Sequence, residues 1–67
     1  MNGEKIKIKI NPKEIAYLDN IIQGYDGLAL VTTIDAAAGI VVVHVTPGTK
    51  TDTLNILTNF PREIEIL

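Results

Sequence analysis

His44 is the only side chain in this 67-residue sequence suited to act as a base near neutral pH, because the chain contains one histidine. Covalent catalysis would need a nucleophile beside that base, and the sequence contains no serine and no cysteine. A threonine hydroxyl remains, but no third group is spaced to orient the imidazole. We therefore predict that the protein is not an enzyme. We expect His44 on an open sheet face, solvated or at an interface, with contact to a ligand or a pH-sensitive association as the alternatives.

Acid–base chemistry by paired carboxylates has no support in the spacing of the acidic residues. Glu63 and Glu65 alternate along one strand with lysines as expected neighbours, while Asp26 and Asp35 occupy turns, where aspartate bonds to the backbone. With no cysteine and one histidine, the chain lacks the ligands for a disulfide, an iron–sulfur cluster or a structural zinc site. We predict no catalytic residue, no metal and no cofactor.

The segment Gly24-Tyr25-Asp26-Gly27 has the glycine content of a phosphate-binding loop. It follows a predicted helix instead of preceding one, so the helix dipole points the wrong way for an anion. We interpret the segment as a helix C-cap followed by a turn.

Lys5, Lys7 and Lys9 form the only basic stripe in a chain whose net charge is −2. RNA-binding sheets stack bases on aromatic side chains, and the two predicted central strands, 6–10 and 40–46, carry none. A nucleic-acid partner is therefore not expected. An accessory role in binding a nucleic acid or nucleoprotein through the Lys5/Lys7/Lys9 strand face remains the alternative function.

The elements that must position these residues follow from the period of the apolar side chains. Isoleucine alternates with charged residues at both ends of the chain, which predicts a strand at 5–10 with lysines outward and a strand at 62–67 with glutamates outward. A helix begins at Asn11-Pro12, where asparagine caps and proline suits the first turn, and it ends at Gly24. Its apolar stripe contains Ile15, Leu18, Ile22 and Tyr25. Tyr17 lies off this stripe and is a candidate for contact with a partner.

Residues 28–35 and 40–46 are rich in β-branched side chains and flank Ala36-Ala37-Ala38-Gly39, which predicts a β-hairpin. With Asp35 opposite Ile40, the predicted core face carries Leu28, Leu30, Thr32, Ile34, Val41, Val43 and Val45. The predicted outward face carries Ala29, Val31, Thr33, Ile40, Val42 and His44. That outward face is too apolar to remain exposed, so we predict it as an oligomer interface. The alanine tip either packs against a partner or replaces longer charged side chains to aid crystallisation.

The second helix starts at Thr49, its predicted N-cap, and four threonines give it a low intrinsic propensity. The order strand, helix, strand, strand, helix, strand predicts two split βαβ units in one domain spanning residues 1–67. Right-handed crossovers place the first strand between the third and the last, with both helices on one face. This is an α+β, ferredoxin-like βαββαβ sandwich with a four-stranded antiparallel sheet.

A domain of this size buries only about 60% of the surface of its unfolded chain, and without disulfides or metals it must gain stability elsewhere. A hydrophobic content of 46% therefore favours a homo-oligomer. No charged leader precedes an apolar stretch and no apolar run reaches membrane-spanning length. We expect a cytoplasmic protein with no membrane partner.

Three segments carry a resemblance to a known fold family: Ile10–Leu18, Gly24–Ala29, and the hairpin with the closing strand. Together they resemble ACT-like regulatory domains, and more closely an uncharacterised family of small bacterial proteins with that fold. ACT-like domains commonly associate, and many bind an amino acid at the interface near the loop that joins the first strand to the first helix. In this sequence that loop is Asn11-Pro12, and it lacks the glycine typical of ligand-binding versions.

The resemblance implies a homo-oligomer, a dimer or higher, that binds a small metabolite such as an amino acid. Together with the residues, it predicts a non-enzymatic, self-associating regulatory or small-metabolite-binding module. The candidate ligand-binding residues are Asn11, Pro12, Tyr17 and His44.

Overall fold

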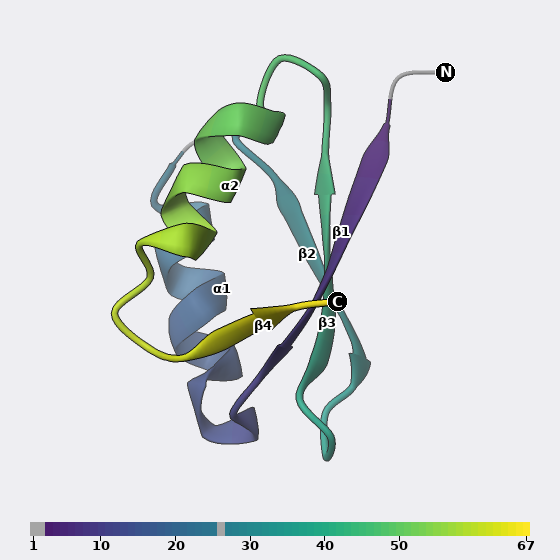
Figure 1. Ribbon diagram of the computed structural model, residues 1–67, viewed down its shortest axis with the longest axis vertical. Coiled ribbons are helices and arrows are strands. Elements are labelled where there is room, and N and C mark those ends of the chain that lie inside the picture. Colours follow the sequence, from purple (N-terminus) through teal and green to yellow (C-terminus); the bar gives the residue numbers. More distant parts are fainter. Residues whose placement is uncertain (1–2, 26) are drawn as a thin grey trace.

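The computed structural model describes residues 3–25 and 27–67. Within them, four strands form one antiparallel sheet in the order β2-β3-β1-β4, and both α-helices lie on one side of it (Figure 1). The elements in chain order are β1 (Glu4–Ile10), the 3-10 helix η1 (Pro12–Glu14), α1 (Ile15–Gln23), β2 (Leu30–Asp35), β3 (Ile40–Val45), α2 (Lys50–Thr58) and β4 (Ile64–Ile66). The ferredoxin-like α+β prediction is confirmed, including the place of β1 between β3 and β4.

The core lies between the sheet and the two helices. Its buried apolar side chains are Ile6, Ile8, Ile10, Leu18, Ile22, Val41, Val43, Val45 and Leu57. Alternate residues of β1 and β3 supply the sheet half of this set, because successive side chains of a strand point to opposite faces. Thr53 of α2 is also fully buried, and its hydroxyl donates to the carbonyl oxygen of Thr49 at 2.8 Å, so the polar atom is satisfied.

The predicted faces of the hairpin are correct for β3 and wrong for β2. Asp35 does pair with Ile40, but Thr33 then pairs with Val41, so Ile34 is an extra residue in a β-bulge. A shift of one residue moves every earlier side chain of the strand to the other face. Leu30 and Ile34, predicted in the core, are 67% and 58% exposed.

The bulge also divides the residues predicted as an oligomer interface. Ala29, Val31 and Thr33 lie on the helix side of the sheet, where Ala29 and Val31 pack against the core. The other three, Ile40, Val42 and His44, lie on the face away from the helices, which we call the open face. β1 adds Lys5, Lys7 and Lys9 to this face, and β2 adds Leu30 and Thr32.

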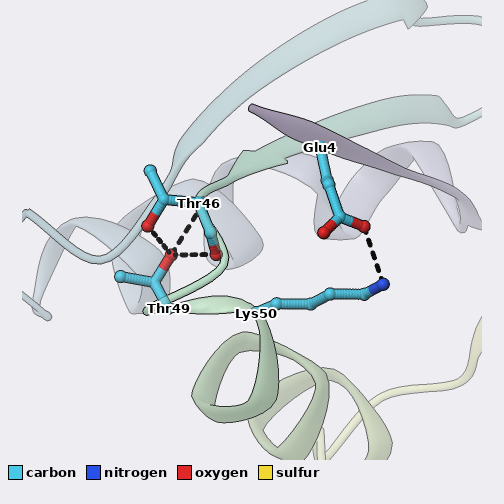
Figure 2. Close-up of polar contacts among 4 residues, drawn as sticks. All are labelled: Glu4, Thr46, Thr49 and Lys50. Carbon is cyan, nitrogen blue, oxygen red and sulfur yellow. Dashed lines mark hydrogen bonds and ion pairs between the residues drawn. The ribbon is translucent and has the colours of Figure 1, made fainter. Parts of the chain in front are cut away.

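Local hydrogen bonds hold the chain in place just before each helical segment. The Asn11 side-chain oxygen accepts the backbone N–H of Lys13 at 3.0 Å, which caps η1 ahead of α1. Thr49 is the N-cap residue of α2, but its hydroxyl does not cap the helix. It accepts the backbone N–H of Thr46 at 3.0 Å and lies 3.2 Å from the Thr46 hydroxyl (Figure 2). These contacts tie the entry of α2 to the end of β3.

An ion pair joins the start of α2 to the start of β1. The Lys50 ammonium lies 2.7 Å from the Glu4 carboxylate, and both side chains are partly exposed (Figure 2). At the other helix, α1 ends at Gln23 and Gly24 is its C-cap, as predicted. The predicted turn residue Asp26 lies outside the described residues. No helix in the described part of the chain has the length and apolar character needed to cross a membrane.

Candidate functional site

A groove of about 630 Å³ lies at the end of the sheet where β1 leaves it, and we call it the strand-end groove. It is lined by Lys9, Ile10, Asn11, Pro12, Ala38, Glu63, Ile64 and Glu65. These residues come from the end of β1, the loop into η1, the tip of the β2–β3 hairpin and the segment that enters β4. Three turns of the chain that are far apart in sequence therefore meet at one site.

The backbone of the hairpin tip fixes one wall of the strand-end groove. Gly39 is buried, adopts a φ of +75° and accepts the N–H of Ile10 through its carbonyl oxygen at 2.9 Å. A Cβ at Gly39 would lie 1.8 Å from the carbonyl oxygen of Ile10, so only glycine permits this close approach. The Asp35 side chain accepts the N–H of Ala38 at 3.0 Å and holds the rest of the tip.

The groove brings charges of both signs together at its rim. Lys9 and Glu65 are cross-strand neighbours, and Glu63 lies just before β4. None of the three takes part in an ion pair among residues 3–25 and 27–67, so these charges remain available to a ligand. The Asn11 side-chain oxygen is engaged by the Lys13 N–H, which leaves the Asn11 amide nitrogen as a donor.

Tyr17 lies away from the strand-end groove, in a cluster that joins α1 to the segment after α2. Its ring centroid is 5.5 Å from that of Phe60, and the Arg62 guanidinium carbon lies 5.0 Å from its ring centroid. The Arg62 Nε also lies 3.2 Å from a carboxylate oxygen of Glu14. Tyr17 is thus half-buried in an intramolecular contact, with the cation held against the ring face.

His44 lies on the open face, opposite Lys5 and therefore at the other end of β1 from the strand-end groove. Its Nε2 is 3.0 Å from the Thr32 hydroxyl, and its cross-strand neighbours are Lys5 and Leu30. The structure therefore brings together Asn11 and Pro12 of the predicted ligand-binding set, and places Tyr17 and His44 elsewhere.

Lys9, Glu63 and Glu65 in the groove, and Arg62 beside Tyr17, were not predicted from the sequence. The alternation along the strands predicted that Lys9, Glu63 and Glu65 share one face of the sheet, but it did not show that the hairpin tip would approach them.

A second, smaller hollow of about 340 Å³ lies beside the C-terminal ends of both helices and is lined mainly by Ile21, Tyr25, Asn55, Asn59 and Phe60. Within the described residues, no three histidine, aspartate or glutamate side chains are grouped to hold a metal ion.

The fold and the groove define a small ferredoxin-like α+β domain with a ligand-sized hollow at one end of its sheet. The chain belongs to the family described as "Domain of unknown function (DUF4911)", whose model matches residues 8–64. The match includes every groove residue except Glu65. Neither the curated proteins nor the solved structures gave a match to this chain.

Proposed function

We propose that this protein is a non-enzymatic module that self-associates and binds a small dipolar metabolite, such as an amino acid, in the strand-end groove. The observation that carries the proposal is the rim of the groove, where Lys9, Glu63 and Glu65 present free charges of both signs. A few convergent polar groups around a hollow of several hundred Å³ are typical of small-molecule sites.

The chemistry of the rim matches a molecule that carries both an ammonium and a carboxylate. The Lys9 ammonium attracts a ligand carboxylate, to which the Asn11 amide nitrogen donates, and the two glutamates attract a ligand ammonium. The groove lies at the loop between the first strand and the first helix, where ACT-like domains bind amino acids, and the resemblance of the sequence to that class supports the same assignment.

The absence of a catalytic role is part of the proposal. His44 is the only histidine, and the hydroxyl of Thr32 is its hydrogen-bond partner. Its neighbours across the two adjacent strands are Lys5 and Leu30, neither of which orients an imidazole as a base. The charged residues of the groove surround a hollow that contains no serine or cysteine nucleophile.

Self-association is supported by the exposed edge strand β2. β2 lies at the edge of the sheet and carries no charge from Leu30 to Ile34, although natural edge strands usually carry charges or proline against unwanted pairing. Antiparallel pairing of two copies around Thr32 places Leu30 of one copy opposite Ile34 of the other. Leu30 and Ile34, both strongly exposed in the single chain, then shield each other from water.

Ligand binding is tested by amide NMR titration with each of the common amino acids. We expect shifts at residues 9–12, 38 and 63–65 for the amino acids that bind. Lys9→Gln should weaken binding by about tenfold or more, because a hydrogen bond to a charged group contributes roughly 1.5–3 kcal/mol. Lys13→Gln, which removes an exposed lysine outside the groove, is the control and should leave binding unchanged. Equal losses in both variants, or no shifts with any amino acid, contradict the proposal.

Self-association is tested by light scattering behind a sizing column. We expect a dimer or larger assembly for the wild type and a monomer for Leu30→Asp. Leu67→Asp is the matched control. Leu67 is 55% exposed and follows β4 at the opposite edge of the sheet, where its N–H donates to the carbonyl oxygen of Lys7. A wild-type monomer at all concentrations, or equal dissociation of both variants, shows that β2 is not the interface.

A further inference from the structure

A row of three ammonium groups crosses the open face of the sheet. Lys5, Lys7 and Lys9 are exposed and point away from the helices, because the isoleucines between them are buried on the other side. None of these lysines is in an ion pair within the part of the chain that the structure describes. Only Lys9 has a carboxylate, that of Glu65, as its cross-strand neighbour on β4. The row therefore forms a basic strip in which Lys5 and Lys7 have no carboxylate as a cross-strand neighbour.

The neighbouring strand β3 presents little free apolar surface beside the lysines, because Ile40 is partly exposed and Val42 is only 9% exposed. Ile40, Val42 and His44 are the cross-strand neighbours of Lys9, Lys7 and Lys5. Leu30 adds apolar surface on β2 next to His44, with 67% of its surface exposed. The open face is thus basic along β1, and its exposed apolar surface is limited to Ile40 of β3 and Leu30 of β2.

We infer that the open face is a docking surface for an acidic amphipathic helix of another protein. Lysines two residues apart on a strand are separated by about 6.8 Å along the strand. Acidic residues four apart on a helix are separated by about 6.0 Å along the helix axis, so the two spacings are similar. A helix of roughly 10 Å diameter spans two strands that are about 4.8 Å apart. Carboxylates at i, i+4 and i+8 then face Lys5, Lys7 and Lys9, and apolar residues on the adjacent helix flank face the partly exposed Ile40.

Charge complementarity favours this occupant over a nucleic acid and over a second copy of the chain. The open face offers no phenylalanine, tyrosine or tryptophan ring on which a base would stack, and Glu65 and Asp35 flank the end of the lysine row at Lys9. Face-to-face packing of two copies about an axis perpendicular to the strands sets each lysine row against the other, and packing about an axis parallel to them sets it against β3, which carries no carboxylate. The proposed self-association uses the edge of β2 and covers Leu30, but it leaves the lysine row and Ile40 accessible, so Leu30→Asp tests self-association and the lysine variants test docking.

The test is an isothermal titration of the protein with a synthetic amphipathic helix that carries Glu at i, i+4 and i+8 beside a leucine stripe. The control peptide has Gln at those three positions. We expect the acidic peptide to bind, with amide shifts confined to β1, β3 and β2, and to weaken as salt is added because exposed charges are screened. The protein variant with Lys5→Gln, Lys7→Gln and Lys9→Gln should bind about tenfold more weakly, the scale of three exposed ion pairs.

Lys13→Gln is the control for loss of positive charge alone and should change the affinity less than twofold. Circular dichroism confirms that the triple variant is folded, which is expected because its changed side chains are exposed. Equal affinity for the Glu and Gln peptides overturns the inference, as does an unaffected triple variant. Tighter binding of a single-stranded oligonucleotide than of the acidic peptide also overturns it and assigns the lysine row to nucleic acid.

Discussion

Gly39→Ala tests the geometry that forms the strand-end groove. Gly39 sits at the hairpin tip with a φ of +75°, and its carbonyl oxygen accepts the N–H of Ile10 at 2.9 Å. An alanine Cβ would lie 1.8 Å from the Ile10 carbonyl oxygen and 3.0 Å from its carbonyl carbon. The clash is with backbone, so it cannot be relieved by rotating a side chain, and the hairpin tip must move away from β1.

The cost of this change has three parts. A non-glycine residue in the left-handed region costs roughly 1–2 kcal/mol. Loss of the Ile10–Gly39 hydrogen bond costs roughly 0.5–1.5 kcal/mol, and forced displacement of packed groups costs roughly 1–3 kcal/mol. We therefore expect a loss of about 3–5 kcal/mol in the free energy of unfolding. A domain of this length has only roughly 3–10 kcal/mol in total, so the variant should be close to unfolded.

Urea unfolding followed by circular dichroism measures the loss. With an m-value of about 1 kcal/mol/M, the midpoint should fall by about 3 M or more, or the folded baseline should disappear. Gly27→Ala is the matched control, since Gly27 has a φ of +72° but no atom within 4 Å of an added Cβ. It should lose only about 1 kcal/mol. Equal losses for the two variants would show that backbone conformation alone, and not the contact with Ile10, makes glycine necessary at the tip.

Three further changes test contacts that hold the helices. Arg62→Ala should lower the free energy of unfolding by about 1 kcal/mol, because a partly exposed ion pair and a cation–π contact are lost. Arg62→Lys should recover part of that free energy. Equal losses for the Ala and Lys variants in urea unfolding would contradict this prediction. Thr53→Val should cost no more than about 1 kcal/mol, because the Thr49 carbonyl oxygen still accepts the Thr53 N–H at 2.9 Å. Thermal unfolding that shows a larger loss for Val than for Ala at this position would refute that account. Lys50→Gln should lower the free energy of unfolding by less than about 1 kcal/mol. The difference from the wild type should shrink in high salt, because the ion pair with Glu4 is exposed and screened. A difference that does not change with salt would contradict an electrostatic origin.

Much of the fold could be predicted because each element has a local signal. Alternating Ile and Lys specify β1, and Asn11 followed by Pro12 specifies the start of the first helical segment, where the Asn11 side chain does accept the Lys13 N–H. The position of Thr49 was also predictable, but the partner of its hydroxyl was not. Thr46 and the backbone of α2 are both within reach of that hydroxyl, and only the tertiary arrangement decides between them.

The hairpin register could not be predicted, since the sequence gives no sign of the bulge at Ile34. Every residue from Leu30 to Ile34 is a good strand former, and glycine, which often marks a bulge, is absent from that stretch. The candidate site shows a similar limit. Asn11 and Pro12 were expected near a ligand, but Lys9, Glu63 and Glu65 join them only because the hairpin tip and β4 converge there.

The bulge changes which surface is available for association. Without it, Leu30 and Ile34 would face the helices, and Val31 would lie beside Val42 on the open face. With it, Val42 is only 9% exposed between its cross-strand neighbours Lys7 and Thr32, while Leu30 and Ile34 are exposed at the sheet edge. The free apolar surface therefore moves from the face to the edge. The open face then carries the basic strip Lys5 to Lys9, and because like charges repel, packing two such lysine rows against each other is unfavourable.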